Sequence, residues 1–452
     1  MGFKDDFVWG IASSSYQIEG AVNEDGRGSS VWDMFCKQPG RIIDGSSGDI
    51  ACDHYHRYKE DISIIKELGI KAYRFSIAWP RIIPTGDGEV NEKGLDFYDR
   101  LIDTILEAGI TPYATLFHWD YPYDLFRKGA WTNPESPKWF LRYAEIIAKR
   151  FGKKLPHIFT FNEPQCFIGI SYAKTEHAPG IQFPLWDTLL MTHNVLLAHG
   201  LTVQAFRSIS PNTKIGYAPC GDAQYPLTES AEDIEAARKA FFAVEEARLF
   251  WSISLWSDPV FLGKYPDELY NNYAQYMPKI GPDDMKIINQ PLDYMGQNIY
   301  NGSPIKADGK GSYEYAKRET GYPFTAAKWP VTPESLYWGP RFLAERYNIP
   351  VYITENGLSC ADVVSVDSKV HDPLRIDFLH RYLSCLKRAA KDGVDIRGYF
   401  HWCLTDNFEW SKGYTERFGM VFCDFTTQKR IIKDSGYWYR DIIKSNGKTL
   451  GE

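Results

Sequence analysis

The sequence predicts a single (β/α)₈ barrel spanning residues 1–452, with long loops at the carboxyl ends of its strands. Two observations support this fold class. One local pattern recurs along the chain: a polar residue, an amphipathic helix, a glycine and then a short apolar strand. No change of composition, flexible linker or charged run divides these units, and α/β barrels of this length commonly form one domain.

Eight segments have the apolar character of strands, and a helical stretch follows each of them. They lie near residues 8–16, 71–77, 111–118, 157–163, 213–219, 293–298, 350–356 and 396–402. Strands that alternate with helices indicate a parallel sheet, and eight such units indicate a closed barrel. The alternative is an open, doubly wound sheet. It would carry a glycine-rich phosphate turn after its first strand, which segment 8–17 lacks.

Four of the helices have clear start and stop signals. The expected starts are Asp53, Asn91, Asn133-Pro134 and Asp372-Pro373, and the expected stops are Gly69, Gly109, Gly152 and Gly393. Polar residues and an early proline favour helix beginnings, whereas glycine favours helix ends. Two connections, 18–52 and 299–331, are unusually long and follow strands. Long ordered loops are usually functional, so these two are expected to wall a deep pocket.

The composition limits the binding partners and the cellular compartment that we expect for the protein. The net charge of −7 gives no basic face for a nucleic acid. Eight scattered cysteines without a C-x-x-C pair predict reduced thiols and no zinc site. The first residues lack a signal peptide, and no apolar run approaches the ~18 residues of a membrane helix. A cytoplasmic protein without a membrane partner is expected, and homo-oligomer formation is left open.

Two glutamates stand at the predicted carboxyl ends of barrel strands. Glu163 ends the fourth strand and Glu355 lies near the end of the seventh. That face of a barrel carries catalysis, and two carboxylates in one pocket can break a glycosidic bond. A separation of ~5–5.5 Å gives retention of configuration and ~6.5–9.5 Å gives inversion. For either glutamate alone, a surface salt bridge is the ordinary alternative.

The chain resembles the family 1 glycoside hydrolases, the β-glucosidase family, from end to end. The matching blocks are Phe7–Ala12 with Tyr16–Gly20, Arg74–Ser76 with Trp79–Arg81, His118–Asp120, Thr160–Pro164, Ile353–Gly357 and Asn407–Trp410. The resemblance implies a retaining β-glycosidase that removes terminal non-reducing β-D-glucosyl residues from a small glycoside or oligosaccharide. Glycosides with a terminal galactosyl or fucosyl residue are further expected substrates. No metal and no cofactor are expected.

The same resemblance implies a role for each matching residue. Glu163 would be the acid/base and Glu355 the nucleophile, while Arg74 and Tyr300 would hold Glu355 ionised. The expected sugar-binding residues are Gln17, His118, Trp119, Asn162, Asn298, Tyr300, Trp402, Glu409 and Trp410. Phe418 and Trp329 are also candidates for the pocket, although core packing explains them about as well.

Four alternatives are weighed against hydrolysis of plain β-glucosides. Glu409 would repel a 6-phosphorylated sugar, and the intact Glu163 argues against a thioglucosidase, in which glutamine replaces it. Transglycosylation shares the covalent intermediate and stays open. A sugar-binding protein without turnover would have lost one of the two glutamates. Tyr121, Gln165 and Thr175 depart from the family pattern and leave the aglycone preference open.

Overall fold

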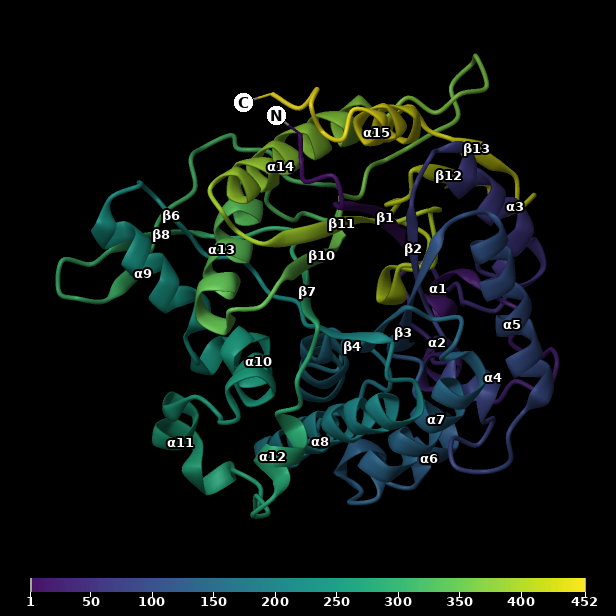
Figure 1. Cartoon of the computed structure of the whole chain (residues 1–452), viewed down its shortest axis with the longest axis horizontal. Coiled ribbons are helices and arrows are strands. Elements are labelled where there is room, and N and C mark those ends of the chain that lie inside the picture. Colours follow the sequence, from purple (N-terminus) through teal and green to yellow (C-terminus); the bar gives the residue numbers. More distant parts are fainter. Residues whose placement is uncertain (1, 452) are drawn as a thin grey trace.

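The computed structural model describes residues 2–451 and contains the predicted closed barrel of eight parallel strands (Figure 1). The strands, in their order around the barrel, are β1 (Val8–Ala12), β11 (Ile396–Trp402), β10 (Val351–Asn356), β7 (Tyr294–Asn298), β5 (Lys214–Ala218), β4 (His157–Asn162), β3 (Thr111–Phe117) and β2 (Ala72–Ser76). Seven of the eight predicted strands agree closely. The first is shorter than predicted because the chain turns into α1 (Ser15–Ile18).

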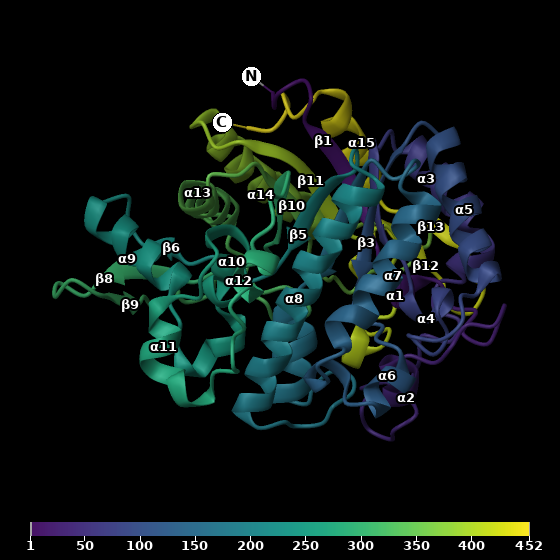
Figure 2. The same ribbon diagram turned by 60° about the horizontal axis from the view of Figure 1, so that its bottom comes forward.

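Helices surround the barrel, as Figures 1 and 2 show. The longer ones are α3 (His54–Glu67), α5 (Glu92–Glu107), α7 (Ser136–Phe151), α8 (Leu185–Ile209), α9 (Ala231–Phe242), α10 (Ile253–Leu262), α13 (Ser335–Tyr347), α14 (Pro373–Lys391) and α15 (Asp434–Lys444). Short helices lie in the connections: α2 (Val31–Cys36), α4 (Trp79–Ile82), α6 (Tyr123–Arg127), α11 (Asp267–Tyr273) and α12 (Asp284–Ile288). In the part of the chain that the structure describes, none is long and apolar enough to cross a membrane.

The inside of the barrel is a packed core. Its buried cluster includes small residues from β1, β2 and β5 and large aromatic residues from the other strands. Those aromatic side chains are Tyr113, Phe159, Tyr294, Tyr352, Phe400 and Trp402. The barrel is therefore filled below its mouth, as in other barrels of this size, and it is not a channel.

Three of the four predicted helix starts are right in place but wrong in mechanism, and the fourth was placed two residues too early. α3, α5 and α14 begin directly after Asp53, Asn91 and Asp372, yet none of these side chains caps its helix. Asn91, for example, donates to the carbonyls of Asp25 and Arg81 instead. α7 begins at Ser136, not at Pro134, because the Asn133 carboxamide accepts from the amide of Glu135 and holds a turn there (2.9 Å).

The glycine signals also divide into two kinds. Gly69, Gly109 and Gly393 adopt the left-handed conformation that ends a helix. Gly152 has a φ of −55°, so backbone handedness does not explain it. A Cβ at that position would lie 2.5 Å from the hydroxyl oxygen of Ser210, and close packing accounts for the glycine.

The two long connections are not plain loops. Segment 18–52 contains α2, whose Trp32 packs on Trp410 with ring centroids 4.6 Å apart. Segment 299–331 contains β8 (Pro304–Ala307) and β9 (Tyr313–Tyr315), which form a small sheet with β6 (Tyr225–Pro226). This sheet projects beside α9 (Figure 2). A separate hairpin pairs β12 (Val421–Cys423) with β13 (Arg430–Ile432).

A buried ion network ties α14 to the C-terminal segments. It consists of Asp362, Asp372, Arg375, Asp406, Arg417 and Lys433. The Lys433 ammonium donates to Asp362 (2.6 Å) and to Asp406 (2.7 Å). Arg375 pairs with Asp362 and Asp372. Three cations thus face three carboxylates, all buried except the partly exposed Arg417, which keeps each buried charge compensated.

Candidate active site

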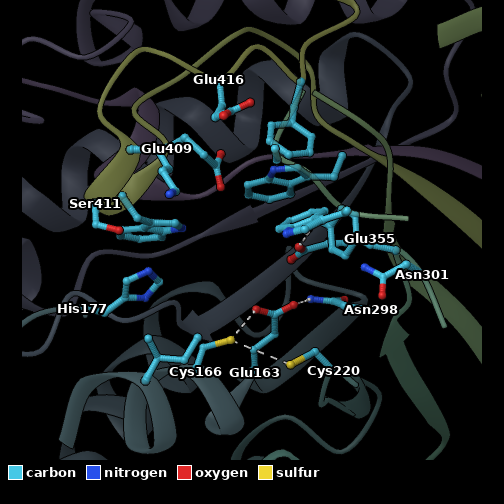
Figure 3. A pocket seen from close by; sticks show the side chains of 18 of the residues that line it. Glu163, Cys166, His177, Cys220, Asn298, Asn301, Glu355, Glu409, Ser411 and Glu416 are labelled. Atoms are coloured by element: carbon cyan, nitrogen blue, oxygen red, sulfur yellow. Dashed lines mark hydrogen bonds between the residues drawn. The ribbon is translucent and has the colours of Figure 1, made fainter. Parts of the chain in front are cut away.

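Glu163 stands at the mouth of the barrel, one residue after β4. Its backbone is left-handed (φ 46°), and its amide donates to the carbonyl of Ala218 (2.8 Å). Such a conformation is costly for a residue other than glycine and is concentrated at functional sites. The next residues form a π-helical segment, Gln165–Ala173. This turn aims the Glu163 carboxyl group into the pocket (Figure 3).

The surroundings of Glu163 favour its protonated form. Asn298 donates to one carboxyl oxygen (2.7 Å) and the Cys166 thiol to the other (3.2 Å), and both hydrogen bonds oppose protonation by stabilising the ionised form. Burial and the nearby negative charge of Glu355 raise the pKa of Glu163 to about 8. A carboxyl group with such a pKa can hold a proton at neutral pH and deliver it.

Glu355 faces Glu163 across the same cavity (Figure 3) but has a cation beside it. Arg74, buried on β2, donates to one carboxylate oxygen (2.6 Å), and the Tyr300 hydroxyl donates to the other (2.8 Å). Burial raises the pKa of Glu355, while Arg74 and Tyr300 oppose that rise by stabilising the ionised form. The two glutamates therefore have unlike surroundings.

Two asparagines connect the pair. Asn162 accepts from Arg74 (2.6 Å) and from Asn298 (3.0 Å), and Asn298 also holds Glu163. Thr354 in turn fixes the Asn298 oxygen (2.6 Å). This chain of hydrogen bonds sets the position of both carboxyl groups relative to each other, although β4 and β10 are far apart in sequence.

His118 presents an unpaired ring nitrogen within residues 2–451. Its Nε2 lies 3.1 Å from the Asn162 amide nitrogen, and its Nδ1 has no protein partner. Burial and the nearby Arg74 lower the pKa of His118, so the ring is neutral. A neutral ring that accepts at Nε2 carries its proton at Nδ1.

Glu409 supplies a further carboxyl group to the pocket wall. Burial and the charge of Glu355 raise its pKa to about 8. Gln17 contacts it from behind: the Gln17 amide donates to Glu409 (3.3 Å), to Asn407 (2.9 Å) and to the carbonyl of Phe408 (3.0 Å). Gln17 therefore holds Glu409 in place and does not itself line the cavity.

Aromatic rings form much of the remaining wall. The pairs Trp119–Trp410, Tyr300–Trp329 and Trp329–Phe418 have centroids 4.4, 5.1 and 5.7 Å apart. Trp402, at the end of β11, stacks beside His118. Flat apolar faces with a few polar groups between them suit the two faces of a pyranose.

The structure brings most of the predicted residues to one pocket of about 420 Å³. Those that line it are His118, Trp119, Glu163, Asn298, Tyr300, Trp329, Glu355, Trp402, Glu409, Trp410 and Phe418. Gln17, Arg74 and Asn162 lie behind this wall and bind the residues that form it. Trp329 and Phe418, for which core packing was the alternative, do both: they line the pocket and pack on Tyr300.

Several lining residues were missed by the sequence analysis. They are Cys166, Ile170, Glu176, His177, Cys220, Gly221, Asp222, Trp251, Asn301, Ala327, Pro330, Ser411, Lys412 and Glu416. Most belong to loops, where no periodicity marks the side that faces a pocket. Cys220 had a usable signal, because it lies just past β5 as Glu163 lies just past β4.

Comparisons with known proteins agree over the whole chain. The model of the family described as Glycosyl hydrolase family 1 matches residues 1–448. A 1,4-beta-D-glucan glucohydrolase of Thermotoga neapolitana is 45% identical over 448 residues, 99% of each chain. A bifunctional beta-D-glucosidase/beta-D-fucosidase of Bifidobacterium breve is 38% identical over 98% of each. A family 1 β-glucosidase of Thermotoga maritima, solved with isofagomine lactam, superposes with a TM-score of 0.90 at 44% identity, covering 98% of this chain and 99% of that one.

Proposed function

The chain belongs to glycosyl hydrolase family 1, and on that basis we propose that it is a retaining β-glucosidase acting on the terminal non-reducing sugar of small β-glycosides. The observation that carries the proposal is the pair of facing glutamates with unlike partners. Glu163 has neutral donors and a raised pKa, whereas Glu355 has the guanidinium of Arg74.

In the first step Glu355 attacks the anomeric carbon while Glu163 protonates the leaving oxygen. The glycosyl–Glu355 ester forms, and its formation removes the negative charge that keeps the pKa of Glu163 high. Glu163, which has given its proton to the leaving group, is then stable as a carboxylate and accepts a proton from the attacking water. One residue thus serves as acid and then as base, with the pKa changing in the direction that each step requires.

The remaining groups hold the sugar. The neutral ring of His118, the carboxyl group of Glu409 and the flat face of Trp402 all line the pocket. Together with Asn298 and Trp410 they surround the space above the two glutamates. We extend the proposal to some β-fucosidase activity, because the Bifidobacterium breve relative is named for both activities. We also propose that the protein works in a reducing, cytoplasmic compartment and that the whole chain forms one catalytic domain.

A panel of aryl glycosides tests this function. The panel varies the sugar (gluco, galacto, fuco), the anomer and 6-phosphorylation, and proton NMR follows the first product formed. We expect the β-glucoside to have the highest kcat/KM, the α-glucoside and the 6-phosphoglucoside to be inert, and β-glucose to appear first. A first product in the α configuration would contradict the double displacement.

A further inference from the structure

Three potential metal ligands meet at the side of the pocket beneath Glu355. Glu163, Cys166 and Cys220 each offer one ligand atom, and these atoms lie within 4.8 Å of one another. The two sulfur atoms are 3.8 Å apart, and the Cys166 sulfur is 3.2 Å from a Glu163 oxygen. Figure 3 shows the three side chains converging on one point. We call them the thiol–carboxylate triad.

The backbone holds the two thiols together. Cys166 lies in the π-helical segment that follows β4, and Cys220 follows β5. The Gln165 side chain joins these segments, donating to the Cys220 carbonyl (2.7 Å) and accepting from the Cys220 amide (3.3 Å). The two cysteines are 54 residues apart in sequence, so no C-x-x-C spacing marks them.

The spacing of the sulfurs matches a specific coordination geometry. Zinc binds cysteine sulfur at about 2.3 Å, and a tetrahedral angle then places two sulfurs about 3.8 Å apart. A carboxylate oxygen at about 2.1 Å completes three protein ligands and leaves a fourth position open. We propose that the thiol–carboxylate triad binds a divalent cation of the zinc class, and that the bound cation inhibits hydrolysis by occupying Glu163.

The pocket also suits a cation electrostatically. Six carboxyl residues and one lysine, Lys412, line it among residues 2–451. The six are Glu163, Glu176, Asp222, Glu355, Glu409 and Glu416. Burial raises the pKa of the Cys220 thiol to about 12 and that of Cys166 well above its ordinary value. Binding of the cation replaces both thiol protons, which are released to solvent.

Inhibition rests on the proposed role of Glu163, but binding does not, so the two can be measured separately. The probe is Cd²⁺, titrated into the purified full-length chain in degassed buffer while the ultraviolet thiolate-to-cadmium charge-transfer band is recorded. Hydrolysis of an aryl β-glucoside is assayed on the same samples. The variants are Cys166→Ala, Cys220→Ala and Glu163→Gln. The matched control is Cys385→Ala, which removes a half-buried thiol of α14 outside the pocket lining.

We expect one equivalent of Cd²⁺ to generate the band, Zn²⁺ to displace it, and activity to fall in parallel and return on addition of EDTA. Either pocket cysteine variant should abolish the band at one equivalent and raise the half-inhibitory concentration at least about 100-fold, since even an outer contact of a metal site is worth about 10–100-fold. Glu163→Gln should keep both thiols but bind Cd²⁺ at least about tenfold more weakly. Cys385→Ala should match the wild type.

Three results would overturn the proposal: no band at one equivalent in the wild type, a band that persists unchanged in Cys220→Ala, or inhibition that only a thiol reductant reverses. The last would indicate a Cys166–Cys220 disulfide in place of a cation site. If the chain bound Cd²⁺ as expected but hydrolysed no glycoside in the panel, the site would stand and the proposed function would fail.

Discussion

The buried ion network and the pocket are two clusters of largely buried charge with opposite behaviour. In the network, burial alone would raise the pKa of Asp362, but Arg375 and Lys433 hold it below its ordinary value. In the pocket, Glu163 and Glu409 have a pKa of about 8. The network contains a cation for every carboxylate, whereas in the described part of the pocket Glu355 pairs with Arg74, and Glu163 and Glu409 have no ion-pair partner.

The difference shows what a buried charge is used for. Compensated charges stay ionised, and their pairing is structural. Carboxyl groups left without a compensating charge keep a proton that can be transferred to a substrate, which is why perturbed pKa values mark functional sites. Substitution of Glu163 or Glu409, which have no ion-pair partner in the described chain, should therefore change catalysis and leave folding nearly intact, and substitutions in the network should do the reverse.

The largest expected effect comes from Glu355→Ala. Loss of the nucleophile should lower kcat on an aryl β-glucoside by about 10⁵-fold or more, since removal of other catalytic nucleophiles costs about 10⁶. Azide should enter the vacated space and restore turnover, with an α-glucosyl azide product identified by NMR. The variant also leaves the buried Arg74 without its carboxylate partner, so its denaturation midpoint should fall below that of the wild type. Unchanged hydrolysis would remove Glu355 from the chemistry.

Glu163→Gln should have the next largest effect, and the effect should depend on the leaving group. General acid catalysis contributes about 10²–10⁴-fold. We expect a loss of that size in kcat/KM for an alkyl β-glucoside and a much smaller loss for a dinitrophenyl β-glucoside, which departs without a proton. A plot of log kcat/KM against leaving-group pKa tests this. Parallel plots for the variant and the wild type would argue against Glu163 as the acid.

Lys433→Met tests the structural cluster. It leaves Asp362 and Asp406 without their shared cation, and breaking a buried ion pair costs about 3–5 kcal/mol. The urea midpoint should fall accordingly, while kcat per folded molecule should stay within about twofold of the wild type. Lys444→Met is the matched control, because its pairing with Asp441 is exposed and worth about 0–1 kcal/mol. A large loss of kcat in fully folded Lys433→Met would contradict a purely structural role for the ion network.

The smallest expected effect is a pH dependence. Glu163 must be protonated to act as the acid, so kcat/KM should fall about tenfold per pH unit above pH about 8, the pKa of that carboxyl group. The same limb should be absent from Glu163→Gln assayed with the dinitrophenyl substrate. Persistence of the limb in that variant would assign it to another group, with Glu409 as the first candidate.

The sequence predicted the barrel and both glutamates because strand ends can be located from apolar runs and glycine stops. Glu163 and Glu355 follow such runs directly. The sequence did not show that Asn91 and Asp372 leave their helices without a side-chain cap, because both side chains bind partners that are distant in sequence. The convergence of Cys166 and Cys220 and the placement of Gln17 behind Glu409 depend on tertiary contacts that no local pattern records.

The filled interior of the barrel has a consequence for polymers. A glucan chain cannot pass through the barrel, because Trp402 and the aromatic residues packed beneath the pocket fill it. Only one end of the polymer can therefore enter the pocket, and it must leave through the same opening. Turnover on such a material would then follow the molar number of chains and not their mass. Two samples of equal weight but different average length should release sugar at rates in inverse proportion to that length.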